Sequence, residues 1–160
     1  MIIIGVDLGG RKAAVAVYAD GQLVKVDAHA TEPVFSRPNQ LASVALWVAQ
    51  QTMNADQIFI EEPIIGRGVR ASIQVIQMGG AVLSELIGRS VHMIPVGNWK
   101  KTILGKGDAS KEHVKAWLES AHPEYAILCQ GDQDRIDAIC IGLYGVHLER
   151  LSRGIMEDLH

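Results

Sequence analysis

Cysteine is scarce in this sequence, which has only Cys129 and Cys140 among its 160 residues. The two stand apart and form no C-x-x-C pattern, so they support neither a disulfide framework nor a zinc site. We expect both to be small, buried, apolar side chains.

Long hydrophobic runs are also missing. The longest apolar stretches, such as Met1–Val6 and Ala13–Tyr18, fall well below the roughly 20 residues that a membrane-spanning helix needs. We therefore expect no membrane segment. The first residues lack the basic stretch of a secretory signal, which predicts a cytoplasmic protein.

The composition shows none of the biases of disordered or fibrous chains. Hydrophobic residues make up 48% and charged residues 21%, enough for a sizeable core. There is no internal repeat, low-complexity tract or linker. Since a domain spans roughly 100–200 residues, we expect residues 1–160 to form one domain.

The strong positive charge that often marks a nucleic-acid partner is absent, because the net charge is −3. The charges are nevertheless unevenly distributed. Gly97–Trp117 contains five lysines and two acidic residues, a net +3, whereas the chain from Leu118 onward carries a net −5. On its own, this asymmetry indicates no more than two solvated faces.

The hydrophobic pattern predicts an α/β fold that starts with three strands, over 2–8, 13–18 and 23–29. The short connections at 9–12 and 19–22 contain glycines suited to positive φ and favour an antiparallel meander. Further strands are expected over 57–61 and 91–94, and helices from near Asn39 through 41–49 and over 69–87, 95–105, 110–121 and 132–151. No G-x-G-x-x-G follows the first strand, which argues against a dinucleotide-binding sheet.

Two of the predicted strands end in acidic residues. Asp7 follows an apolar run, and Glu61 and Glu62 follow another. A charge at the end of a buried strand is costly unless something compensates it. For Asp7 alone, hydrogen bonds to the amides of the next turn are an equally good explanation. If the two strands are neighbours, however, their carboxylates converge and repel each other unless a cation lies between them.

The last predicted helix carries another pair of acids. Asp134 and Asp137 are three residues apart and project from one face. Asp132 is expected to be a solvated first-turn residue stabilised by the helix dipole. An apolar stripe packs this helix on the sheet and directs Asp137 inward; it consists of Ile136, Ile139, Cys140, Leu143 and Tyr144.

Carboxylates with no histidine or cysteine at ligand spacing form a hard-oxygen set that suits Mg²⁺, with Mn²⁺ as a substitute. Two such ions in one site activate a water molecule and stabilise the leaving oxygen of a phosphoryl displacement. We expect two ions per site. Their charge would change the formal balance from −3 to +1, so the acidic composition does not argue against DNA.

Four segments, taken in order, resemble the RuvC-type Holliday junction resolvases, which have an RNase H-like fold. They are Ile4–Gly9, Ile60–Glu62, the basic segment Trp99–Lys111, and Asp134–Ala138. Each is a weak signal alone, but the ordered set is strong and spans nearly the whole chain. The resemblance implies a five-stranded mixed sheet, with an antiparallel meander of strands 1-2-3 and then parallel strands, flanked by helices.

The resemblance also implies a function and a catalytic set. Its members cut four-way junctions, and we expect action on other branched DNA as well, by nicking opposed strands to leave 5′-phosphate and 3′-hydroxyl ends. The implied metal ligands are Asp7, Glu61, Asp134 and Asp137, with Glu61 preferred over the weaker candidate Glu62. A homodimer would supply one site for each strand. The compact chain fits a cellular or a bacteriophage member.

DNA contacts are expected from the basic segment and from the loop after the strand at 57–61. The resemblance assigns phosphate contacts near the scissile bond to Lys100 and Lys111. Family members often carry an aromatic wedge where this chain has Ile64, which puts strict junction selectivity in doubt. An apolar wedge still parts base steps in other proteins, although an ordinary surface loop is nearly as good an interpretation. The expected DNA-contacting set is Lys100, Lys101, Lys106, Lys111, Arg67, Arg70 and Ile64.

Three other functions fit parts of the sequence. A ribonuclease H acting on RNA–DNA hybrids is the nearest enzymatic alternative. A non-catalytic junction-binding scaffold fits less well, because a pure DNA binder gains by losing acids that repel phosphate. Asp7–Lys12 is also similar to the first phosphate loop of actin-like and sugar-kinase ATPases, but those proteins clamp the nucleotide between two domains.

Trp47 and Trp117 occupy apolar helical positions and are expected in the core. Trp99 stays undecided between the core and a surface that stacks on bases.

Overall fold

A five-stranded sheet forms the centre of the computed structural model, which describes residues 1–63 and 68–154. The strands lie in the order β3-β2-β1-β4-β5. The first three pair antiparallel, β4 runs parallel to β1, and β5 runs parallel to β4. The predicted mixed sheet is therefore confirmed. Its strands are β1 (Ile2–Leu8), β2 (Lys12–Ala19), β3 (Gln22–Ala30), β4 (Gln57–Glu61) and β5 (Val91–Ile94).

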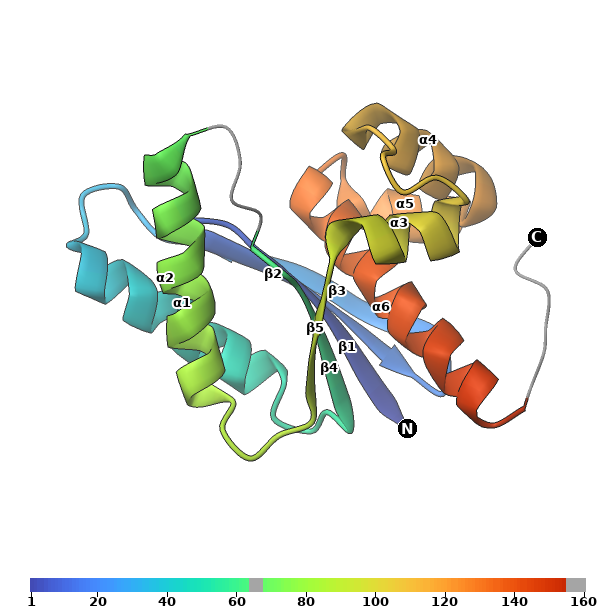
Figure 1. Cartoon of the computed structure of the whole chain (residues 1–160), viewed down its shortest axis with the longest axis horizontal. Coiled ribbons are helices and arrows are strands. Elements are labelled where there is room, and N and C mark those ends of the chain that lie inside the picture. Colours follow the sequence, from blue (N-terminus) through green and yellow to red (C-terminus); the bar gives the residue numbers. More distant parts are fainter. Residues whose placement is uncertain (64–67, 155–160) are drawn as a thin grey trace.

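Helices cover both faces of the sheet, α1 and α2 on one and α3 to α6 on the other (Figure 1). Within the described residues, no helix has the length and apolar character to cross a bilayer. The helices are α1 (Arg37–Gln51), α2 (Val69–Glu85), α3 (Val96–Leu104), α4 (Lys111–Ala121), α5 (Pro123–Cys129) and α6 (Gln133–Ser152).

The sheet separates two hydrophobic cores, because successive strand residues point to opposite faces. Ile3 and Phe59 pack in the core beneath α6, whereas Ile4 and Ile60 pack beneath α1 and α2. The same alternation places Asp7 on the α6 side with Ile3, and Glu61 on that side with Phe59. The two strand-end acids therefore share a face of the sheet. Both cysteines are buried and free, as expected.

Strand β1 and helix α6 approach each other to backbone contact. A Cβ atom added at Gly5 would lie 2.3 Å from the amide nitrogen of Gly142 and 2.4 Å from the carbonyl oxygen of Ala138. One added at Gly142 would lie 2.4 Å from Cε2 of Tyr18. The absence of side chains at Gly5 and Gly142 lets α6 lie directly over the centre of the sheet.

Three details of the helix predictions need correction. Helix α1 begins at Arg37 rather than near Asn39, with Pro38 in its first turn, where a missing amide hydrogen costs nothing. Helix α5 was not predicted, because seven residues are too short for a periodic apolar pattern. Helix α2 also ends at Glu85, slightly earlier than expected.

The glycine prediction holds for the second β-turn and is wrong for the first. Asp20 and Gly21 adopt positive φ values of 51° and 83°, whereas Gly9 and Gly10 do not. At Gly9, the lack of a side chain instead leaves room for the side chain of Lys12, because a Cβ atom there would lie 2.9 Å from Cγ of Lys12.

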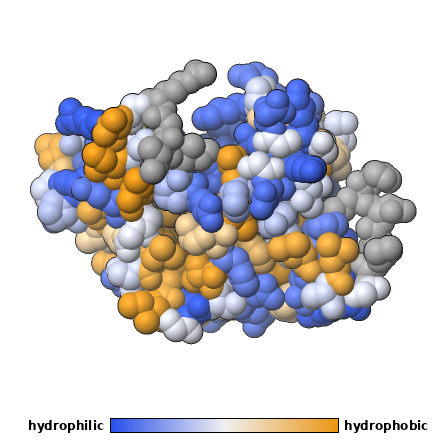
Figure 2. All heavy atoms as spheres, in the orientation of Figure 1, coloured by the Kyte–Doolittle hydropathy of each residue, from blue (hydrophilic) through white to orange (hydrophobic). Residues whose placement is uncertain are grey.

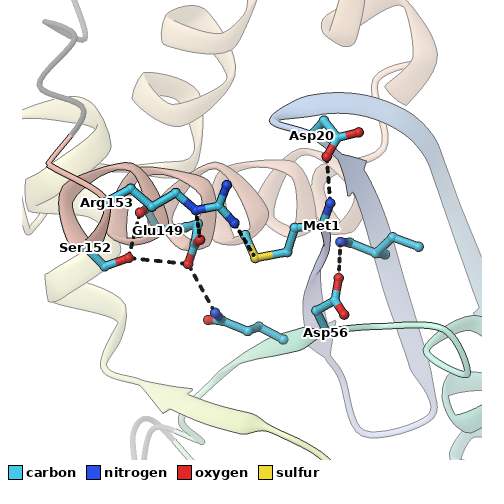
Figure 3. Close-up of polar contacts among 8 residues, drawn as sticks. Met1, Asp20, Asp56, Glu149, Ser152 and Arg153 are labelled. Carbon is cyan, nitrogen blue, oxygen red and sulfur yellow. Dashed lines mark hydrogen bonds and ion pairs between the residues drawn. The ribbon is translucent and has the colours of Figure 1, made fainter.

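A polar network closes one end of the sheet around the first residue (Figure 3). The amino group of Met1 donates to Oδ1 of Asp20 across 2.6 Å. Glu149 of α6 pairs with Arg153 and accepts a 3.3 Å hydrogen bond from Nε2 of Gln57. These bonds attach the C-terminal part of α6 to the start of β4.

Candidate active site

The carboxyl ends of β1 and β4 bring two acids together. In the parallel pairing of these strands, Val6 lies opposite Ile60. Asp7 and Glu61 are the next residues, so they lie at the ends of neighbouring strands and on the same face. Both side chains are partly buried.

Helix α6 contributes the other two acids. Asp132 is its N-cap, and its side chain accepts a 3.0 Å hydrogen bond from the amide of Asp134. Asp132 therefore caps the helix, as its predicted place in the first turn suggests. Asp134 lies in the first turn, and Asp137 follows one turn later on the face toward the sheet.

The four carboxylates act on one another electrostatically. Burial raises the pKa of Asp7 well above its ordinary value, and the negative charges of Asp137, Glu61 and Asp134 raise it further. Burial also raises the pKa of Glu61 and of Asp137, with each feeling another carboxylate of the set. The structure therefore brings all four predicted residues into one cluster, in which Asp7, Glu61 and Asp137 are each harder to ionise than an isolated carboxyl group.

Three of these carboxylates have defined partners in the protein. Nε1 of Trp99 donates to Oε2 of Glu61 across 2.7 Å, and Nε2 of Gln133 donates to Oδ1 of Asp137 across 2.8 Å. The third contact is an ion pair between Lys12 and Oδ2 of Asp134. Each partner restricts the orientation of the carboxylate it holds.

Sequence reasoning missed these partners. Gln133 stands one helical turn before Asp137, a spacing that typically permits a side-chain hydrogen bond. The sequence alone does not decide the place of Trp99, which is a buried core residue whose indole N–H reaches the site. For Lys12 there was no signal, because its approach to Asp134 depends on how β2 packs beside α6. Trp47 and Trp117 are partly buried against the two cores, as predicted.

Two lysines of the basic segment lie on the Glu61 and Asp137 side of the cluster. Lys100 of α3 donates from Nζ to the carbonyl oxygen of Ala109 at 2.8 Å. Lys111, the first residue of α4, is exposed. The positive charges of Lys100 and Lys111 lower the pKa of both Glu61 and Asp137.

The remaining residues predicted to contact DNA either are exposed or lie outside the described part of the chain. Lys101 and Lys106 are exposed, with Nζ of Lys106 4.0 Å from Oδ1 of Asp108, and Arg70 is exposed at the start of α2. The predicted wedge Ile64 and the predicted phosphate contact Arg67 lie outside the described residues.

An open pocket of about 220 Å³ adjoins the cluster, and both Glu61 and Glu62 border it. Its lining includes Asp7, Glu61, Glu62 and Pro63. Glu62 is exposed, whereas Glu61 is partly buried and held by Trp99. The geometry favours Glu61 as the ligand.

The donor set fits a hard divalent cation. It offers four carboxylates, three of them with a pKa raised by burial, and a cation would offset the repulsion among them. Within residues 1–63 and 68–154, however, no three histidine, cysteine, aspartate or glutamate side chains already converge on one metal position. Lys12, Gln133 and Trp99 engage three of the carboxylates instead.

Comparisons with known proteins agree with this geometry. No family model matches the chain. The chain is 32% identical over 127 residues to the crossover junction endodeoxyribonuclease RuvC of Chlorobaculum parvum. The aligned region covers 74% of this chain and 67% of that protein. Its identity to RuvC of Salinibacter ruber is 27% over 158 residues, 89% of this chain and 83% of that one.

A solved structure extends the similarity to the fold. The structure of Thermus thermophilus RuvC in complex with a Holliday junction substrate superposes with a TM-score of 0.75, covering 95% of this chain and 96% of that one at 20% identity. From the level of identity and the extent of the match to the C. parvum protein, the chain belongs to the RuvC family of crossover junction endodeoxyribonucleases.

Proposed function

We propose that this chain resolves Holliday junctions by metal-dependent hydrolysis, with Asp7, Glu61, Asp134 and Asp137 as metal ligands. The convergence of these acids from β1, β4 and α6 carries the proposal, since a cluster of this kind has a clear use in phosphoryl transfer. The junction complex of the T. thermophilus protein supports branched DNA as the substrate. We assign the activity to a single domain over residues 1–160.

Neighbouring side chains orient two of the proposed metal ligands before any ion binds. Bound Mg²⁺, or Mn²⁺ in its place, two ions per site, would activate the attacking water and stabilise the leaving oxygen. Trp99 and Gln133 hold the carboxylates of Glu61 and Asp137 in fixed orientations. Partners of this kind typically matter because they orient ligands before a metal arrives.

The basic segment supplies the charge that DNA requires. Lys100 and Lys111 lie beside Glu61 and Asp137, where they offset the repulsion between carboxylates and backbone phosphates. We assign phosphate contacts to both. Lys101, Lys106 and Arg70 are exposed, and we assign further DNA contacts to them.

A homodimer completes the proposed enzyme, because a junction presents two strands to be cut. Helix α2 exposes an apolar stripe at helical spacing, and Figure 2 shows apolar side chains gathered over this helix. Gly80 lies within the stripe, with no atom within 4 Å of its added Cβ. A second copy covering this stripe would bury it symmetrically. The exposed side chains of the stripe are Val69, Ile73, Ile76 and Leu83.

Cleavage of a substrate panel by the wild-type protein tests the proposed function. The panel contains a labelled mobile four-way junction, a flap, a linear duplex and an RNA–DNA hybrid, each with and without Mg²⁺. We expect symmetric, metal-dependent nicking of the junction, and flap cleavage would measure the effect of Ile64 on selectivity. Cleavage of the hybrid alone would identify a ribonuclease H, and junction binding without cutting under any divalent metal would identify a scaffold.

A further inference from the structure

Lys12 reaches the acidic cluster from β2, outside the basic segment. It is the first residue of β2, and its Nζ forms an ion pair with Oδ2 of Asp134. Its aliphatic stem lies over Gly9, where an added Cβ would come within 2.9 Å of Cγ and 3.4 Å of Cε. The amide of Gly9 also donates to the carbonyl oxygen of Lys12 at 2.9 Å. The β1–β2 turn thus directs this lysine toward α6.

The charges divide the cluster into two halves. Lys12 interacts with Asp134, Asp132 and Asp7. Lys100 and Lys111 act on Glu61 and Asp137 instead. The half of the cluster that contains Asp134 therefore carries its own positive charge, from a residue outside the basic segment.

We propose that the Lys12 ammonium occupies Asp134 in the metal-free protein and that a divalent ion must displace it, so that Lys12 sets the metal concentration at which the site loads. The inference rests on the proposed function, in which Asp134 is a metal ligand. A divalent ion bound at Oδ2 of Asp134 would meet the positive charge of the Lys12 ammonium already held there, and the two cations repel, so they compete for this carboxylate.

An open space beside the ion pair can accommodate the Lys12 side chain after it is displaced from Asp134. Lys12 is about half exposed, with 52% of its side-chain surface accessible against 20% for Asp134. An open pocket of about 320 Å³ beside the pair is lined by Lys12, Asp134, His29 and Arg135, among others. Lys12 can rotate into this space without disturbing the core.

Metal binding without DNA tests this competition. Mn²⁺ affinity is measured by titration calorimetry for the wild type, Lys12→Met and Lys12→Arg. We expect Lys12→Met to bind Mn²⁺ about fivefold more tightly, the effect of removing one exposed ion pair, and Lys12→Arg to keep the wild-type affinity. Lys25→Met is the matched control, since Lys25 pairs with Asp27 through side chains of similar exposure on the edge strand β3.

A double-mutant cycle assigns the effect to Asp134. In an Asp134→Asn background, Lys12→Met is expected to tighten Mn²⁺ binding by clearly less than in the wild-type background, because the competing ion pair no longer exists and only the weaker charge interactions with Asp132 and Asp7 remain. Unchanged or weaker Mn²⁺ binding by Lys12→Met, in a protein whose wild type binds the ion, would overturn this inference alone. A wild type that binds no Mn²⁺ would overturn it together with the proposed metal site.

Discussion

The indole nitrogen of Trp99 donates a hydrogen bond to Oε2 of Glu61 across 2.7 Å. Trp99 belongs to α3 and is only 1% exposed, so this bond links the start of the basic segment to the acidic cluster. Burial raises the pKa of Glu61, and the bond from Trp99 opposes that effect by stabilising the ionised carboxylate. Trp99 therefore acts as a positioning residue for a proposed metal ligand.

Trp99→Phe removes the N–H donor and keeps an aromatic ring in the core. Glu61 then loses the bond that favours its charge, so its pKa rises further and more of it is protonated at a given pH. We expect metal affinity to fall about tenfold, as with other partners that orient metal ligands. The pH profile of junction cleavage should also shift upward.

Trp117→Phe serves as the control for this prediction, because Trp117 packs against the same core and makes an edge-to-face contact with His122 rather than a hydrogen bond to one of the four carboxylates. Its metal affinity and pH profile should match the wild type. A Trp99→Phe protein with an unmoved pH profile would leave Trp99 with a packing role only.

Asp7 makes the metal-free protein less stable as the pH rises. Because its pKa is raised in the folded state, the folded protein holds a proton that the unfolded chain has already released above an ordinary value of 3.8. The contribution of Asp7 to the free energy of unfolding therefore falls as the pH increases from 3.8 through the raised pKa. Asp7→Asn removes this penalty.

We expect Asp7→Asn to melt about 3 °C higher than the wild type in EDTA at neutral or alkaline pH, the shift that roughly 1 kcal/mol produces in a chain of this size. The gain should disappear toward pH 4. Saturating Mn²⁺ should reverse the order, since only the wild type gains full binding energy. Thermal melts across a range of pH measure the difference in melting temperature between Asp7→Asn and the wild type. An Asp7→Asn protein that melts below the wild type in EDTA at high pH would contradict this prediction.

Lys111 is predicted to contact a backbone phosphate. The slope of log K against log salt for binding a four-way junction should decrease by about one unit in Lys111→Ala. Lys115→Ala is the matched control, because Lys115 lies one turn along α4 and already pairs with Glu119 across 3.9 Å. Equal salt slopes in Lys111→Ala and the wild type would exclude the phosphate contact.

Gly5→Ala is expected to destabilise the fold and misplace the acids. The added methyl group would overlap the backbone of α6 at Gly142, so the helix must move away from β1. We expect a loss of about 3 kcal/mol or more in the free energy of unfolding, measured by urea denaturation. At Gly97 the nearest atom lies 3.9 Å from an added Cβ, so Gly97→Ala should keep the wild-type midpoint.

Much of the fold follows from local sequence patterns. Short continuous apolar runs define β1, β2 and β4. Ser110 caps α4 by accepting from the amide of His113, as expected. The acids at strand ends and the Asp134–Asp137 spacing indicated a cluster because strand and helix periodicity determine which side chains share a face.

Contacts between elements that are distant in the sequence do not follow from local patterns. The ion pair of Lys12 with Asp134 joins residues of β2 and α6 that no sequence periodicity relates. The Trp99–Glu61 bond likewise depends on how α3 packs against the end of β4. The sequence therefore predicted the carboxylates, whereas the side chains that orient and neutralise them depend on tertiary packing.

The most direct test of the account compares junction cleavage and junction binding in four single variants, Asp7→Asn, Glu61→Gln, Asp134→Asn and Asp137→Asn. Asp27→Asn is the control, because Asp27 lies on β3 and pairs with Lys25 away from the cluster. We predict that each of the four variants binds the four-way junction but loses Mg²⁺-dependent nicking by at least about 100-fold, the scale of losing a group that acts in the transition state. Asp27→Asn should cut like the wild type. Wild-type rates in any of the four would contradict the proposed catalytic set.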